Sequence, residues 1–88
     1  MPKSKRLRGL TIYPTERVYV KLGQRIKFIR EMLGITQVKL AKKIGITRTS
    51  LTNVEAGRQR VLLHSVLLYA RALHTQPEHL LKGIWKTK

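Results

Sequence analysis

With 88 residues the chain is long enough for one small domain, and its lack of cysteine excludes a disulfide framework and a cysteine-based zinc site. Nineteen lysines and arginines against four acidic residues give a formal net charge of +15, which indicates a polyanionic partner. Nucleic acid and an anionic membrane surface both fit that charge. No apolar run approaches membrane-spanning length, however, and the N-terminus lacks the apolar core of a signal peptide.

Residues 1–20 are expected to form a basic N-terminal arm ahead of the domain. The basic residues of this arm are Lys3, Lys5, Arg6 and Arg8. The segment around them lacks a helical apolar pattern, which fits either an arm that lies along phosphates or a solubilising chain end. Residues 10–13 and 18–20 are β-prone and flank a proline, which allows a small hairpin. Alternatively, Thr15 caps a helix that runs directly into the next one. We favour extended structure here.

A first domain helix is predicted from about Lys21 to Leu33, ended by Gly34. Apolar residues at i, i+4, i+7 and i+11 form a narrow stripe that is expected to face the core, namely Leu22, Ile26, Ile29 and Leu33. Phe28 and Met32 lie off this stripe but next to each other. They are expected to pack under the preceding segment, with a dimer contact as the alternative.

Residues 36–57 have the pattern of two short helices joined by a tight glycine turn. Thr36 and Thr47 are suited to cap the starts of these helices, and Gly45 and Gly57 are suited to end them. The apolar edge of the first helix consists of Leu40, Ala41 and Ile44. Helices this short bury little surface alone, so they need a scaffold on one side and leave the other side free.

The second of these helices has two different faces. At about 100° per residue, Leu51 and Val54 fall together on one side. The opposite side carries the polar residues Arg48, Thr49, Thr52 and Asn53. Arginine and asparagine can pair bidentately with guanine and adenine edges in the major groove. An ordinary solvated face would look the same, but the preceding helix and glycine turn complete a helix-turn-helix, whose second helix enters the major groove.

The residues that carry a family resemblance extend well beyond this turn. Between residues 36 and 60 they are Thr36, Gln37, Leu40, Ala41, Gly45, Ile46, Thr47, Leu51, Val54, Glu55, Gly57 and Arg60. Upstream they are Leu22, Gly23, Ile26, Ile29 and Arg30, and downstream they are residues 70–73 and 77–81. In this register the chain resembles the phage repressor and Cro type of helix-turn-helix protein, also called the Xre family, over about residues 21–82. The resemblance implies an all-α, five-helix, lambda-repressor-like DNA-binding domain at 21–82, between the basic arm and a basic C-terminal tail at 83–88.

The resemblance also implies roles for individual residues outside the base-reading face. Arg30 and Glu55 match positions that form an ion pair between the first helix and the recognition helix. Gln37, Arg58 and Arg60 match positions beside the phosphate backbone, where contacts fix register without reading sequence. The helix N-terminus at Gln37 also favours an anion. The alternative for Gln37 is a simple exposed polar residue at a helix start.

For base reading we expect Arg48 and Asn53 to carry most of the sequence preference. Thr49 and Thr52 are expected to contact a thymine methyl group or a nearby phosphate. Glu55 could accept a hydrogen bond from cytosine, but it lies at the margin of the outward face, so the ion-pair role is favoured.

Two more helices are predicted after the loop. The fourth has a broad apolar face and no side chain suited to cap its start; the face consists of Leu63, Val66, Leu67, Ala70 and Leu73. His74 stands where the family often has glycine. Pro77 opens a fifth helix at its favoured first position and Gly83 closes it. In related domains this helix often helps form the dimer, and Trp85 either closes the monomer core or joins a partner.

No metal, cofactor or catalytic site is expected. Three histidines lack cysteine companions, and their spacing places no two of them on one helical face; they are His64, His74 and His79. The acidic residues are scattered, namely Glu16, Glu31, Glu55 and Glu78. No Ser-His-acid or phosphate-cradling glycine pattern occurs. The chain is therefore expected to be no enzyme.

The expected function is that of a sequence-specific regulator of transcription that binds double-stranded DNA in the cytoplasm. We expect a repressor that acts as a homodimer on an inverted-repeat operator. One alternative is an antitoxin that holds a toxin, a small protein partner, while repressing its own operon. The other is a binder of nucleic acid without sequence preference, including RNA. Against RNA, no aromatic residue falls on the outward face of the recognition helix, where bases could stack.

Overall fold

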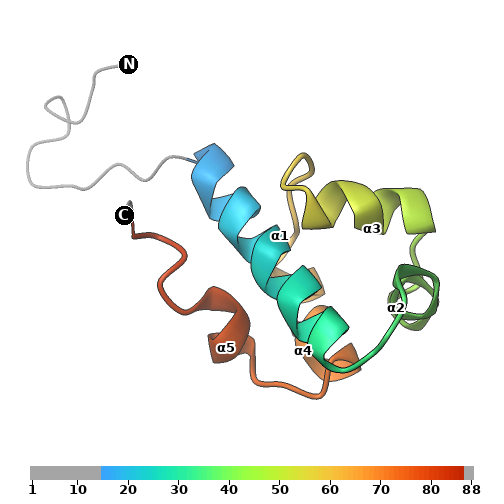
Figure 1. The fold of residues 1–88 in the computed structure, drawn as a ribbon. Coiled ribbons are helices and arrows are strands. Elements are labelled where there is room, and N and C mark those ends of the chain that lie inside the picture. The colour runs from blue at the N-terminus through green and yellow to red at the C-terminus, as the bar shows by residue number, and fades with distance from the viewer. Residues whose placement is uncertain (1–14, 87–88) are drawn as a thin grey trace, which may run out of the picture.

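Five α-helices and no strand make up residues 15–86, the part of the chain that the computed structural model describes (Figure 1). The helices are α1 (Thr15–Met32), α2 (Gln37–Ile44), α3 (Arg48–Glu55), α4 (Leu63–Ala72) and α5 (Pro77–Leu81). This architecture confirms the all-α, five-helix expectation. None of these described helices combines the length and the apolar character that crossing a membrane requires. The four cations expected in the basic arm lie outside the described residues.

α1 begins earlier than the sequence pattern predicted, at Thr15. The expectation of extended structure is therefore wrong for the segment just after Pro14, and the alternative of one continuous helix is correct. Tyr19 packs against the core, and Val20 lies against Gly57. These tertiary contacts favour helix over the local β-propensity, which depends strongly on context. The β-prone residues 10–13 lie outside the described residues.

Threonine caps and a left-handed glycine fix the helix-turn-helix as expected. Thr36 Oγ1 accepts a hydrogen bond from the Lys39 amide at 3.1 Å, and Thr47 Oγ1 accepts one from the Ser50 amide at 3.0 Å. Gly45 follows α2 with a φ of 89°, a conformation that residues with a Cβ rarely adopt. The turn between α2 and α3 is therefore short and fixed at both ends.

The core lies between the helices, and each helix contributes to it. Its largest fully buried side chains are Ile26, Leu40, Leu51, Leu73 and Leu80. α1 lies between α3 and α5 and contacts both of them (Figure 1). This longest helix is therefore the scaffold for α3, whereas α2 packs against α3 and α4.

Three apolar residues near the end of α1 are exposed. Leu33 is 47% exposed, which corrects its expected place in the core stripe, because α1 ends at Met32 and Ile35 packs against the core instead. Phe28 and Met32 are 60% and 71% exposed. Residues 15–20 cannot cover them, since they continue the same helix.

The buried face of α4 also differs from the expectation. Leu63 and Leu67 were expected in the core but are 76% and 53% exposed. Tyr69, which was not expected in the core, is buried. The inward face follows an i, i+3, i+4, i+7 pattern made of Val66, Tyr69, Ala70 and Leu73. Almost every residue around the start of α4 is apolar, so periodicity alone could not orient this helix. As expected, no side chain caps it at Leu62.

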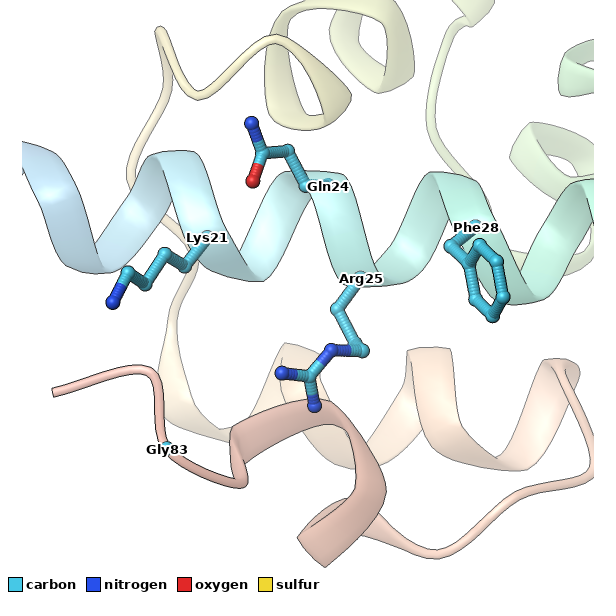
Figure 2. A pocket seen from close by; sticks show the side chains of 5 residues that line it. All are labelled: Lys21, Gln24, Arg25, Phe28 and Gly83. Carbon is cyan, nitrogen blue, oxygen red and sulfur yellow. The ribbon is translucent and has the colours of Figure 1, made fainter. Parts of the chain in front are cut away.

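Arg25 attaches α5 to α1 (Figure 2). Its Nη1 and Nη2 donate to the carbonyl oxygens of His79 at 2.5 Å and Lys82 at 3.0 Å, and these groups lie at the end of α5. Lys21 donates to the carbonyl oxygen of Lys86 further along the chain. Figure 2 shows both cations reaching from α1 toward the C-terminal segment, beside a hollow that Phe28 also lines.

Candidate nucleic-acid interface

α3 presents a polar face outward because its apolar face is buried. Leu51 and Val54 are 0% and 3% exposed, and α3 contacts both α1 and α2. On the other side, Arg48 and Thr49 are exposed and Asn53 is half-buried. The division of faces that the sequence predicted is therefore present in the fold.

The backbones of α1 and α3 approach each other closely at Gly23. A Cβ at this position would overlap the carbonyl oxygen of Val54 and lie 2.8 Å from that of Glu55. At Gly57, a Cβ would lie 2.6 Å from the Cα of Val20. Two glycines thus allow the end of α3 to lie directly against α1, which fixes the angle at which α3 leaves the core.

A buried ion pair joins the same two helices. Arg30 Nε donates to Glu55 Oε2 at 2.6 Å, and Arg30 Nη2 donates to Glu55 Oε1 at 3.1 Å. Arg30 is only 8% exposed and Glu55 only 6% exposed. Arg30 Nη1 also donates to the carbonyl oxygen of Ile35 at 2.8 Å, which ties the loop before α2 to the pair. This is the pairing that the family resemblance implied.

Gln37 connects the ion pair to the outer face of α3. Its Nε2 donates to Glu55 Oε1 at 3.0 Å, and its Oε1 accepts from Arg48 Nε at 3.3 Å. Thr52 Oγ1 lies 3.2 Å from Gln37 Oε1 and 3.0 Å from the carbonyl oxygen of Arg48. A hydroxyl has one proton, so Thr52 donates to one of these acceptors at a time. The charge of Glu55 is thus paired inside the fold, and the outer face of α3 displays the single cation Arg48.

The loop after α3 carries the other expected contacts. Arg58 and Arg60 are exposed, and Arg58 Nε donates to Asn53 Oδ1 at 3.2 Å. The structure therefore brings one expected phosphate contact beside one expected base reader. The sequence did not predict that pairing.

Tyr69 is a further residue of this region that the sequence analysis missed. It is 2% exposed, and burial, with a smaller contribution from the negative charge of Glu55, raises its pKa from 10.0 to about 12. A tyrosine within an apolar run resembles any other core residue, so the sequence carried no signal that Tyr69 lies near the ion pair.

The described residues hold no group of three histidines or acidic residues that could bind a metal ion. His64 and His74 are exposed, and His79 Nδ1 lies 2.9 Å from Thr75 Oγ1. His74 adopts a φ of 54°, the left-handed conformation that a glycine would normally supply after this helix.

The geometry is that of a helix-turn-helix whose outer face carries Arg48, and comparisons with known proteins find the same fold. A helix-turn-helix family model matches residues 26–80. The restriction-modification controller protein C.AhdI from Aeromonas hydrophila is 37% identical over 70% of this chain and 94% of its own, with a TM-score of 0.68. The P22 c2 repressor in complex with a synthetic operator is 31% identical over 70% of this chain and 94% of its own, with a TM-score of 0.64. A hypothetical transcription factor from Neisseria is 27% identical over 82% of this chain and 84% of its own, with a TM-score of 0.69.

No curated protein sequence matches the chain. The family model nevertheless covers most of its length, and the sequence identity to C.AhdI extends over nearly all of that protein. This chain belongs to the helix-turn-helix family of the phage-repressor and Cro type. That family consists of DNA-binding transcriptional regulators rather than enzymes.

Proposed function

We propose that the protein binds double-stranded DNA in a sequence-specific manner and represses transcription in the cytoplasm. The observation that carries the proposal is the outer face of α3, where Arg48 and Thr49 are exposed beside Asn53 on a helix anchored by its opposite face. Arg48 pairs with guanine and Asn53 with adenine in the major groove, while Thr49 and Thr52 contact a thymine methyl group or a phosphate.

Phosphate contacts hold α3 in register. Arg58 and Arg60 lie just beyond its end, where a recognition helix in the groove is flanked by the backbone. Gln37 Nε2 donates one of its two protons to Glu55, which leaves the second for a phosphate oxygen. Gln37 also opens α2, whose first amides favour an anion.

The active form is a homodimer, and α5 offers the surface best suited to it. A net charge of +15 makes most pairs of faces repel each other. The hollow beside α5 combines apolar Pro77, Leu81 and Trp85 with the opposite charges of Glu78 and Lys82. A two-fold contact pairs a surface with itself, so carrying both charges makes this face self-complementary. The two copies of α3 would then lie about one DNA turn, roughly 34 Å, apart.

Selection from a randomised duplex library at about 150 mM salt tests the proposal, because non-specific phosphate binding is already weakened there. An inverted repeat with half-sites about 10 base pairs apart should be enriched. Arg48→Ala should change the enriched sequence. Arg71→Ala, which removes an exposed arginine from α4, should not. Tight binding at low salt with no enriched sequence would contradict the proposal and favour a non-specific binder.

Phe28 and Met32 favour a second candidate, an antitoxin with a small protein partner. They form an exposed apolar pair on α1, and such exposed apolar groups mark protein contacts when they gather in a patch. A complex of defined stoichiometry with a toxin, lost in Phe28→Ser but kept in Arg71→Ala, would support this candidate.

A further inference from the structure

The way in which α3 ends brings Arg58 beside Asn53. The Gly57 amide donates to the carbonyl oxygen of Val54 at 3.0 Å, and the Arg58 amide reaches back to that of Asn53 at 2.9 Å. Gly57 has a φ of 78°, so these bonds form a Schellman motif. In this motif the residue after the glycine donates its amide to a carbonyl in the last turn of the helix, so these two residues lie next to each other. The backbone itself therefore puts residues 53 and 58 in contact.

The side chains use this proximity in a directional way. Arg58 Nε donates to Asn53 Oδ1 at 3.2 Å, where a hydrophobic contact is frequent in such motifs. A terminal carboxamide has a broad, roughly two-fold last torsion, so both of its orientations are readily accessible. A guanidinium donates and cannot accept, so it selects the orientation with Oδ1 toward Arg58. Nδ2 is left as the donor for another partner.

We propose that Arg58 is a specificity-determining positioning residue, which holds the Asn53 carboxamide in the orientation that reads adenine. The inference rests on the proposed function. Oδ1 has two lone pairs, so it accepts from Arg58 and from the adenine N6 amino group together, while Nδ2 donates to adenine N7. With the carboxamide reversed, Oδ1 would contact the base without Nδ2. It would then accept equally from the adenine N6 or the cytosine N4 amino group. The Nη groups of Arg58 remain for a phosphate.

Binding to duplexes substituted at one base pair tests the proposal. The position that Asn53 reads is the one where Asn53→Ala abolishes base preference. Arg58→Ala should lower the preference for adenine there about two- to tenfold, the value of one net hydrogen bond, in addition to weakening all duplexes. Arg60→Ala, which removes an exposed arginine from the same loop, should weaken all duplexes equally. In the Asn53→Ala background, Arg58→Ala should have no further effect on base preference.

Equal weakening of every duplex by Arg58→Ala, as for Arg60→Ala, would overturn the positioning role and leave the proposed function intact. Absence of any preferred base for the unaltered protein would contradict the proposed function instead. In that case the NMR resonances of the Asn53 side-chain amide, measured in the free protein, test whether Arg58 positions this group. A shift of these resonances in Arg58→Ala but not in Arg60→Ala supports positioning, and no shift in either variant refutes it.

Discussion

Replacing Glu55 with alanine would remove the carboxylate that joins α1, α2 and α3. Glu55 accepts from Arg30 Nε at 2.6 Å, from Arg30 Nη2 at 3.1 Å and from Gln37 Nε2 at 3.0 Å. The variant leaves the Arg30 guanidinium buried, with only 9% of its side chain exposed. Its remaining partners are the carbonyl oxygen of Ile35 and the carboxylate of Glu31 at 3.7 Å.

The expected cost follows from this burial. Removing one partner of a buried pair costs about 3–5 kcal/mol, because the other charge stays desolvated without compensation. A small domain has about 5–15 kcal/mol of stability in total, so Glu55→Ala should lose a large part of it. Glu31→Ala is the matched control, because its carboxylate also contacts Arg30 but its side chain is 58% exposed. That variant should lose no more than about 1 kcal/mol.

Urea unfolding followed by circular dichroism measures both losses. With a slope near 1–1.5 kcal/mol/M, the midpoint of Glu55→Ala should fall by about 2 M or more. Replacing the pair together, as Arg30→Met with Glu55→Leu, should recover most of the loss, since no buried charge is left unpaired. A Glu55→Ala midpoint no lower than that of Glu31→Ala would refute the assignment of the ion pair as the junction of the three helices.

Further variants probe other parts of the molecule. Gly23→Ala should destabilise the fold by about 1–3 kcal/mol in urea, despite the higher helix propensity of alanine, because its Cβ would overlap the Val54 carbonyl oxygen. The stability of the parent should fall by about 2 kcal/mol between pH 10 and 12, because the unfolded chain ionises Tyr69 near 10.0 while burial holds the folded pKa at about 12. Tyr69→Phe should remove this part of the alkaline loss, so equal pH profiles for the parent and Tyr69→Phe would exclude the mechanism. Arg48→Ala should remove about 1–3 kcal/mol of discrimination at one base pair per half-site, measured with single-base substitutions, and unchanged discrimination there would disprove its base-reading role.

Local signals were sufficient to predict the helix-turn-helix. The caps at Thr36 and Thr47 and the turn at Gly45 depend on neighbouring backbone groups, so their sequence positions define them. The division of α3 into faces follows from helical periodicity alone. The Arg30–Glu55 pair joins residues far apart in sequence, and only the family resemblance suggested it.

Signals that depend on tertiary packing were missed. Tyr19 belongs to a β-prone segment, but contact with the core holds it in α1. Leu63 and Leu67 appeared as suitable for the core as Tyr69, because α4 is apolar on nearly every side. The contact between Asn53 and Arg58 follows from a left-handed glycine between them, which places a loop residue over the last turn of the helix. Sequence spacing within a helix does not describe such a pair.

The most direct test of base reading by α3 compares two affinities at about 150 mM salt. One duplex carries the inverted repeat enriched by selection, and the other has the same base composition in scrambled order. Specific regulators bind their site about 10³-fold or more tightly than other DNA, and we expect a ratio of that order here. A ratio near one would show that the charge of the protein alone holds the DNA, and it would contradict sequence reading by Arg48 and Asn53.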